Sequence, residues 1–341
     1  MKAMLLDGVT QLSVNRHPLR LSELEEPSIG EQDVLIRVSA CGVCHTELDE
    51  IEGRTPPSFF PIVLGHQIVG TIVAAGESAH HFRIGERVGV AWIFSACGTC
   101  KSCRDGNENL CADFKGTGRD ANGGYAELMV ASEKFCYPIP KEFSDAEAAP
   151  LLCAGAIGYR SLNLCQLQDG QSLGLTGFGA SAHLVLKMAR HRFPHSAMFV
   201  FARSEREREF AMDLGAAWTG DTTDTPPRKL DAIIDTTPVW KPVLEALKNL
   251  DAGGRLVINA IRKEERDKEE LMKLSYPDHL WLEKEIKSVA NVARRDVREF
   301  LQLAAEMKIR PDVEEFALKD ANHALVDLKA AKIRGAKVLR T

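Results

Sequence analysis

One stretch decides the fold: Gly174-Leu-Thr-Gly177-Phe-Gly179-Ala-Ser-Ala182-His183. It ends an apolar segment, residues 171–177, that we expect to be a strand, and it opens a segment, residues 180–192, that we expect to be a helix. Gly177 suits the tight turn between them, Gly179 lets the backbone approach a pyrophosphate, and Ala182 fits the contact of helix with sheet. The free N–H groups at the start of such a helix bind phosphate. The stretch therefore predicts a dinucleotide-binding unit.

Strands and helices keep alternating beyond this unit. The expected strands are residues 198–202, 231–235 and 254–259, and the expected helices are residues 205–214 and 239–250. This alternation, with right-handed crossovers, predicts a parallel sheet covered by helices on both faces. We therefore expect an α/β Rossmann domain with a doubly wound parallel sheet over residues 154–288. A further helix is expected over 298–307 and a final strand over 335–339.

The first 153 residues have a different pattern. Short β-type runs, residues 34–38, 68–73 and 87–91, are separated by glycine and proline at short intervals. Such spacing is typical of small, strongly bent sheets. A chain of 341 residues is long enough for two domains. We expect a β-rich domain over residues 1–153, to which residues 289–341 return.

Composition and charge argue against several classes of function. The net charge of −5 gives no electrostatic reason to expect nucleic acid or an anionic membrane as a partner. No apolar run approaches the roughly 20 residues that span a bilayer, and the first residues lack the apolar region of a secretory signal. We therefore expect a cytoplasmic protein, in which the nine cysteines stay reduced and are better explained by metal binding than by disulfides.

Four of the cysteines, spaced C-x2-C-x2-C-x7-C, are Cys97, Cys100, Cys103 and Cys111. The two-residue gaps let neighbouring thiolates converge on one ion, and four thiolates make a closed, structural zinc site. The residues around them could not otherwise build a folded lobe, which we place at residues 95–113. An iron–sulfur cluster, whose ligand spacing begins in a similar way, is one alternative. Four free or buried cysteines are the other.

A second metal site is predicted from three segments that lie far apart in the sequence. They contain Cys41 and Cys44, then His66, then Cys153. Cysteine and histidine together form open zinc sites, which have three protein ligands and keep a fourth position for water or substrate. Spacing alone does not choose between Cys41 and Cys44. An isolated cysteine with apolar neighbours, such as Cys153, is by itself more often a core residue than a ligand.

Together these segments resemble the zinc-containing alcohol dehydrogenases of the medium-chain dehydrogenase/reductase family. The resemblance runs nearly end to end and includes Gly123-Gly124-Tyr125-Ala126-Glu127 after the lobe. It implies a GroES-like catalytic domain beside the Rossmann domain, two zinc ions per subunit, and hydride transfer between a nicotinamide cofactor and a small alcohol or aldehyde. It assigns the catalytic zinc to Cys44, His66 and Cys153. It also implies a homo-oligomer, a dimer or tetramer formed through the cofactor domain.

The resemblance also assigns roles around the catalytic zinc. Thr46 matches the hydroxyl that relays the alcohol proton, His45 a residue against the pyrophosphate, and Glu47 the acid that hydrogen-bonds the liganding histidine. Asp49 stands where many relatives carry the histidine that ends the relay, so that Asp49 or water is left as proton acceptor. Gln67 replaces a glutamate, which should make the zinc slightly more electrophilic and suit carbonyl reduction. Two further departures from the family pattern are Ile157, for a threonine beside the nicotinamide, and Ala336, for a phosphate-binding arginine.

The residues after the second Rossmann strand bear on the choice of cofactor. NAD-specific enzymes carry a carboxylate there for the ribose 2′-hydroxyl, but this chain has Ala202 followed by Arg203 and Ser204. Arg203 could pair with a 2′-phosphate, a charge-assisted contact worth roughly 1.5–3 kcal/mol. The alternative is that Arg203 points into solvent, and Arg208 either assists or is a surface residue. We predict NADP(H) in preference to NAD(H), with Arg203 and Ser204 as its contacts.

The substrate side is the least specified part of the prediction. Trp92 matches a position that narrows the pocket beside the metal in relatives, which would favour primary alcohols and linear or aromatic aldehydes; core packing is the alternative. Cinnamyl- and polyol-type dehydrogenases are the alternatives within the family. A nucleic-acid module built on the lobe would need a basic face with aromatic residues, which is missing. A catalytically silent zinc protein would lack one of the three catalytic ligands, and all are present.

Overall fold

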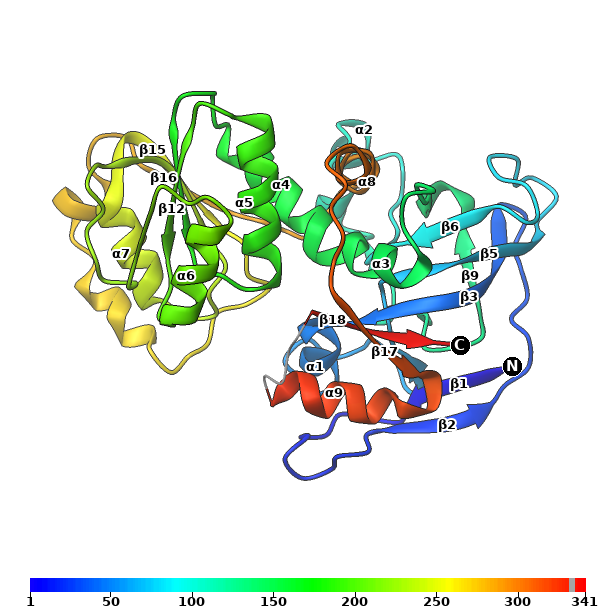
Figure 1. Ribbon diagram of the computed structural model, residues 1–341. Helices are drawn as coiled ribbons and strands as arrows, with labels where there is room; N and C mark the ends of the chain where they lie inside the picture. Colours follow the sequence, from blue (N-terminus) through cyan, green and yellow to red (C-terminus); the bar gives the residue numbers. More distant parts are fainter. Residues whose placement is uncertain (331–334) are drawn as a thin grey trace. The chain divides into compact units, whose positions relative to one another are not determined.

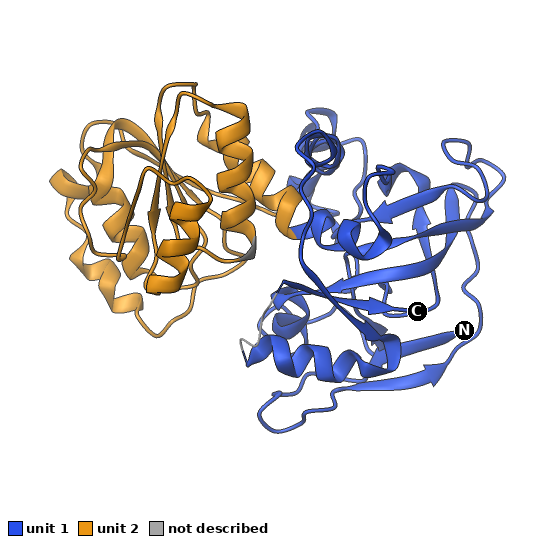
Figure 2. Ribbon diagram, viewed as in Figure 1, with its two compact units in different colours: residues 1–153, 292–341 blue, residues 154–291 orange. Residues whose placement is uncertain are grey.

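The computed structural model describes residues 1–330 and 335–341. The chain divides into two compact units, residues 1–153 with 292–341 and residues 154–291 (Figure 2). We expected the corresponding boundaries after residues 153 and 288. The last strand of the chain belongs to the first unit, where Leu339 lies opposite Cys41 in an antiparallel pair.

The first unit is built on a seven-stranded sheet. Its strands follow the order β10-β6-β5-β3-β18-β17, and β9 pairs with β3 (Figure 1). Val34, Ile36 and Val38 alternate along β3 and pack into one apolar core, as the period of two of a strand requires. The strand bounds are β3 (Asp33–Val43), β5 (Ile68–Ala75), β6 (Arg87–Val90), β9 (Leu128–Ser132), β10 (Cys136–Pro138), β17 (Val313–Ala317) and β18 (Ala336–Arg340).

Smaller elements complete the first unit. Helix α8 begins four residues before its expected start, because the Asp296 carboxylate accepts a hydrogen bond from the N–H of Ala293 at 2.8 Å. Alanine is a poor N-cap residue, so this helix start leaves little signal in the sequence. The remaining strands are β1 (Lys2–Leu6), β2 (Leu19–Glu23), β4 (Ile62–Val63), β7 (Ile93–Ser95) and β8 (Lys115–Gly116). The helices are α1 (His45–Ile51), α2 (Lys101–Arg104), α3 (Asp145–Pro150), α8 (Arg294–Glu306) and α9 (Ala321–Lys329).

The second unit is a six-stranded parallel sheet packed against helices (Figure 1). The strand order β13-β12-β11-β14-β15-β16 is that of a Rossmann sheet, which confirms the expected fold class. The strands are β11 (Ser172–Thr176), β12 (Ala197–Phe201), β13 (Trp218–Gly220), β14 (Leu230–Asp235), β15 (Leu250–Ile258) and β16 (Glu285–Ser288). The helices are α4 (Ala156–Cys165), α5 (Ala180–Arg192), α6 (Glu205–Asp213) and α7 (Lys241–Asn249).

The order of the sheet reverses between β11 and β14, which are neighbours although far apart in the chain. Ligands of doubly wound sheets bind beyond the carboxyl ends of the strands at such a switch point. Thr176 and Asp235, the last residues of these two strands, lie opposite each other in the register. Within the described parts of the chain, no helix combines the length and the apolar character needed to cross a membrane.

Candidate active site and metal centres

Cys44 stands at the start of helix α1, directly after strand β3. Its N–H donates to the Glu47 carboxylate at 2.8 Å, and its Sγ accepts a hydrogen bond from the N–H of Thr46 at 3.4 Å. This is a capping box in which a thiol replaces the usual hydroxyl. The capping box fixes the Cys44 sulfur at the end of β3, in a position where it can serve as a metal ligand.

Three side chains from distant segments converge on one point. Cys44 Sγ lies 3.6 Å from His66 Nε2, and that nitrogen lies 3.3 Å from Cys153 Sγ. The three ligand atoms all lie within 4.8 Å of one another. Two such ligands on a tetrahedral zinc are separated by about 3.5 Å, given Zn–S and Zn–N bonds of about 2.3 and 2.0–2.1 Å. The donor set and its spacing therefore fit a zinc ion with one open position.

The structure decides between the two neighbouring cysteines of the first segment. Cys41 lies within β3, is fully buried, and is not among the residues that surround this point. Burial raises the pKa of its thiol well above the ordinary value, and the charge of Glu47 adds to the shift. Because Cys41 lies in the core and only Cys44 lies beside His66 and Cys153, Cys41 is a core residue and Cys44 is the candidate ligand.

Glu47 orients the histidine of this site. Its carboxylate lies 2.6 Å from Nδ1 of His66, and both side chains are buried, 0% and 1% exposed. A carboxylate on one ring nitrogen of a histidine fixes the ring and directs the other nitrogen to the metal. This geometry matches the role that the resemblance implied for Glu47.

The other residues assigned around the metal occupy varied surroundings. His45 is exposed, and Thr46 is partly buried. The Asp49 carboxylate is ion-paired with Arg54, a partner that the sequence did not reveal. Gln67 is buried, and its side chain packs against Gly42 in β3. The two residues that depart from the family pattern lie in other elements, Ile157 in α4 and Ala336 at the start of β18.

Glu50 is a buried acid that the sequence analysis missed. It follows Glu47 by three residues and so shares its face of α1. It is fully buried, and neither carboxylate oxygen has a hydrogen-bond partner among the described residues. Burial and the charge of Glu47 raise the pKa of Glu50 well above its ordinary value. The three-residue spacing was the one available signal, but helical acids are usually exposed.

The four cysteines of the lobe also surround one point. Their sulfur atoms all lie within 4.8 Å of one another, and Cys97 Sγ lies 3.9 Å from Cys103 Sγ. Four sulfurs around one zinc are separated by about 3.8 Å, and a cluster of several irons needs more space. Hydrogen bonds from Thr99 and Cys100 lower the pKa of Cys97 to about 6, which favours its thiolate. The geometry thus favours one zinc ion over an iron–sulfur cluster.

Trp92 is packed inside the β-rich unit. Its ring stacks on Phe114 with a centroid distance of 4.9 Å, and the guanidinium of Arg119 lies 5.3 Å from the ring. The side chain is almost fully buried. These contacts support the core-packing interpretation, and a role of Trp92 in a substrate pocket stays a prediction.

The glycine turn of the second unit has the conformation that its residues predicted. Gly177 has φ of 78°, in the left-handed region that favours glycine. Gly179 is the N-cap of α5, and a Cβ added there would meet no protein atom within 4 Å. Ala182 is fully buried. The backbone at Gly179 is therefore open to a phosphate group at the N-terminus of a 13-residue helix.

Cationic side chains gather where β12 ends. Arg203 and Ser204 are exposed, and Ala202 is buried. Arg208 reaches back from α6 and donates to the carbonyls of Ala202 at 2.8 Å and Arg203 at 3.0 Å. Arg208 is thus held at the end of the strand, and the position of the usual carboxylate holds only a methyl group.

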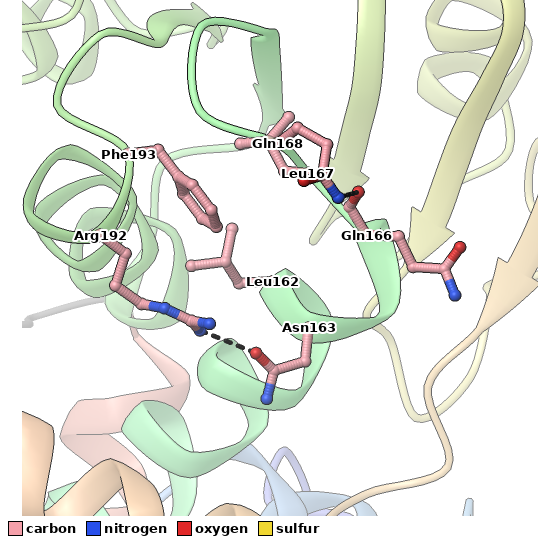
Figure 3. A pocket seen from close by; sticks show the side chains of 7 residues that line it. All are labelled: Leu162, Asn163, Gln166, Leu167, Gln168, Arg192 and Phe193. Carbon is pink, nitrogen blue, oxygen red and sulfur yellow. Dashed lines mark hydrogen bonds between the residues drawn. The ribbon is translucent and has the colours of Figure 1, made fainter.

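The second unit also contains a cavity of about 470 Å³ (Figure 3), which the glycine turn does not line. It is bounded by the end of α4, the loop that precedes β11, and the end of α5. Arg192 closes one side by donating to the Asn163 side chain at 2.7 Å. These residues lie at the amino end of β11, opposite the carboxyl end where the glycine turn begins. The cavity is therefore separate from the candidate cofactor site.

The chain is similar to alcohol dehydrogenases over nearly its whole length. The alcohol dehydrogenase GroES-like domain family matches residues 30–141. A probable alcohol dehydrogenase of Mycobacterium tuberculosis is 41% identical over 94% of this chain and 92% of its own. An alcohol dehydrogenase of Geobacillus stearothermophilus is 31% identical over 95% and 97% of the two chains.

Solved structures show the same architecture. A cinnamyl alcohol dehydrogenase of Sorghum bicolor superposes with a TM-score of 0.85 at 26% identity, covering 99% of this chain and 97% of its own. The alcohol dehydrogenase of the archaeon Aeropyrum pernix superposes with a TM-score of 0.85 at 25% identity and covers both chains completely. With the Cys44–His66–Cys153 centre, the four-cysteine lobe and the Rossmann turn in place, the chain belongs to the zinc-type alcohol dehydrogenases of the medium-chain dehydrogenase/reductase family.

Proposed function

We propose that this oxidoreductase interconverts small primary alcohols and aldehydes, uses NADP(H) in preference to NAD(H), and holds two zinc ions per chain. The observation that carries the proposal is the convergence of Cys44, His66 and Cys153 at zinc-ligand spacing. Cys97, Cys100, Cys103 and Cys111 would hold the second ion. An assay of aldehyde-dependent NADPH consumption by the zinc-loaded protein, with a chelator control, tests the proposal.

Some residues of the site hold the metal ligands in place, and others transfer the proton of the substrate. When bound, zinc acts as a Lewis acid on the substrate oxygen, and the nicotinamide carries the hydride. Glu47 keeps the Nε2 of His66 directed to the metal, and the N–H of Thr46 holds the Cys44 sulfur. The Thr46 hydroxyl relays the proton of the alcohol: it accepts that proton and donates its own to the next group. Because the Asp49 carboxylate is already paired with Arg54, water is the better final acceptor.

Replacing Thr46 by valine tests the relay. Valine preserves the shape of the side chain and the backbone N–H that binds Cys44, but it removes the hydroxyl. Positioned proton transfer contributes at least about 10²-fold, so we expect a loss of that order in kcat/KM for alcohol oxidation. Thr46→Ser, which restores the hydroxyl, should recover most of the rate. Full activity of Thr46→Val would refute the relay.

The preference for NADP(H) rests on the charges at the end of β12. Arg203 is exposed there, Arg208 is held beside it, and Ala202 offers no carboxylate to a ribose 2′-hydroxyl. We expect Arg203→Ala to lower kcat/KM with NADPH by about 10-fold or more, the equivalent of one charge-assisted contact, and to leave NADH almost unaffected. Parallel steady-state assays with the two cofactors measure this.

Arg206→Ala is the matched control for this cofactor test. Arg206 is another exposed arginine, in the first turn of α6, and its removal changes the net charge by the same amount. It should leave the ratio of NADPH to NADH activity unchanged. An equal effect of the two variants would mean that overall charge, rather than a contact of Arg203, sets the preference.

The substrate class and the assembly are less constrained. The likeness to a cinnamyl alcohol dehydrogenase keeps aromatic aldehydes in the proposed range, with a cinnamyl-type activity as second candidate. Association of copies through the Rossmann unit is supported by β16, an edge strand of its sheet whose Ile286 is half exposed. Trp281 and Leu282, just before that strand, are also exposed. A dimer or tetramer thus stays our expectation.

A further inference from the structure

A buried ion pair at the carboxyl edge of the Rossmann sheet has no part in the chemistry proposed above. Asp235, the last residue of β14, is fully buried, and the side chain of Lys263 that pairs with it is only 7% exposed. In the register of the sheet, Asp235 lies opposite Thr176. Gly177 follows Thr176, so the ion pair lies beside the turn that approaches the dinucleotide.

The ammonium group of Lys263 joins two segments of the chain. Besides the Asp235 carboxylate, Nζ donates to the carbonyls of Thr237 at 2.7 Å and Val239 at 3.2 Å. Thr237 in turn donates to Asp235 Oδ1, from its hydroxyl at 2.8 Å and its N–H at 3.3 Å. All three donors of the ammonium are therefore used. The pair fixes residues 237–239 to the end of β14.

The segment held in this way packs on the glycine turn. Thr236 donates to the carbonyl of Thr176 from its N–H at 2.9 Å and its hydroxyl at 3.0 Å. A Cβ added to Gly177 would lie 2.9 Å from Thr236 Oγ1 and 3.1 Å from Thr237 Cγ2. Residues 236–239 thus form one wall of the turn, and a shift of that wall would move the turn.

Residues around Lys263 reinforce the same connection. The N–H of Glu264 donates to the carbonyl of Pro238 at 2.6 Å. The Asp267 carboxylate accepts hydrogen bonds from the N–H groups of Trp240 and Lys241, both at 2.9 Å. The loop after β15 and the loop after β14 therefore form one hydrogen-bonded layer, and the ion pair is its buried centre.

Stability alone does not explain the ion pair. Burial raises the pKa of Asp235 above its ordinary value although the charge of Lys263 acts in the opposite direction. The loss of hydration therefore outweighs the attraction between the two charges. Apolar residues of similar size are often as stable as a buried ion pair, or more so, but they lack its directed hydrogen bonds.

We infer that Lys263 and Asp235 are positioning residues that hold the glycine turn in the conformation that binds the cofactor. This inference rests on the proposed NADP(H)-linked function. It predicts that the ion pair affects cofactor affinity more than folding.

The double variant Lys263→Met/Asp235→Leu separates affinity from stability. It replaces the charges by apolar groups, so we expect a melting temperature close to that of the wild type. Without directed hydrogen bonds on residues 237–239, the Kd for NADPH should rise at least about 10-fold. Protein fluorescence measures the Kd, and circular dichroism measures the melting temperature. KM for NADPH should rise more than kcat falls.

Arg255→Met is the matched control. Arg255 is also a largely buried cation of this sheet, ion-paired with Glu285 and donating to the carbonyl of Leu164 at 2.9 Å. It lies opposite Ala232, near the amino ends of the strands and away from the turn. Its loss should lower the melting temperature and leave the Kd for NADPH unchanged.

The outcomes distinguish this inference from the proposed function. If the wild type binds neither NADPH nor NADH, the proposed function is wrong, and the inference that rests on it is wrong as well. If the wild type binds NADPH, an unchanged Kd in the double variant, or an equal rise in Arg255→Met, overturns the inference alone. The single variant Lys263→Met, which removes the same hydrogen bonds to Thr237 and Val239, serves if the double variant does not fold, and an unchanged Kd there has the same meaning.

Discussion

Replacing His66 by alanine is expected to lower kcat/KM by at least about 10³-fold, because zinc contributes several kcal/mol to the stabilisation of the reacting oxygen. The imidazole ring of His66 lies between the two cysteine sulfurs, with Nε2 at 3.6 Å from Cys44 Sγ and 3.3 Å from Cys153 Sγ. Zinc analysis of the purified variant should find one ion per chain in place of two. The lobe should keep its ion, since its four ligands all come from the lobe itself.

Cys41→Ser is the control for this experiment. Cys41 lies in β3, three residues before Cys44 in the same segment, but its thiol is buried in the apolar core of the first unit. This variant should keep two zinc ions and most of the activity, with some loss of stability. If Cys41→Ser lost the catalytic zinc and His66→Ala kept it, the assignment of the ligands would be wrong.

The second large effect is expected at the lobe. Replacing Cys103 by serine removes one thiolate from a closed four-sulfur site, and zinc binding of this kind contributes about 10–16 kcal/mol to the folding of small zinc domains. A partial loss of that free energy should lower the melting temperature by about 10 °C or more. Zinc content and thermal unfolding followed by circular dichroism measure the effect.

Cys136→Ser is the matched control for the lobe. Cys136 is a buried cysteine of the same unit, and burial raises the pKa of its thiol to about 12, so it is a neutral core residue. This variant should keep both zinc ions and lose less stability than Cys103→Ser. Retention of two ions in Cys103→Ser would contradict a structural zinc site in the lobe.

The fold and the metal centres could be predicted because their signals are local or chemically rare. The glycine turn needs a residue without a side chain at Gly177, where φ is positive, and an open backbone for a phosphate at Gly179, and both glycines are visible in a short stretch. The cysteines of the lobe lie within fifteen residues, 97–111, so their spacing reports their geometry directly. Helix α5 was expected at the bounds that the structure shows, Ala180–Arg192.

The remaining features depend on contacts between distant residues. The choice of Cys44 over Cys41 as a ligand depends on where His66 lies in the fold. The ion pair of Lys263 with Asp235 joins residues that are 28 positions apart in the sequence, and no sequence motif marks it. Asp49 was expected near the relay, but its partner Arg54 arises from the fold of the turn after α1. The roles of Thr46, Arg203 and Trp92, and the cytoplasmic location, stay predictions.

The most direct test of zinc-dependent hydride transfer is an absorbance assay of NADPH and NADH consumption with linear and aromatic aldehydes. The zinc-loaded protein should turn over with NADPH, more slowly with NADH, and should lose activity when a chelator removes the catalytic ion. A clear preference for NADH would overturn the cofactor assignment and leave the enzyme class intact. No turnover with either cofactor at two zinc ions per chain would contradict the account.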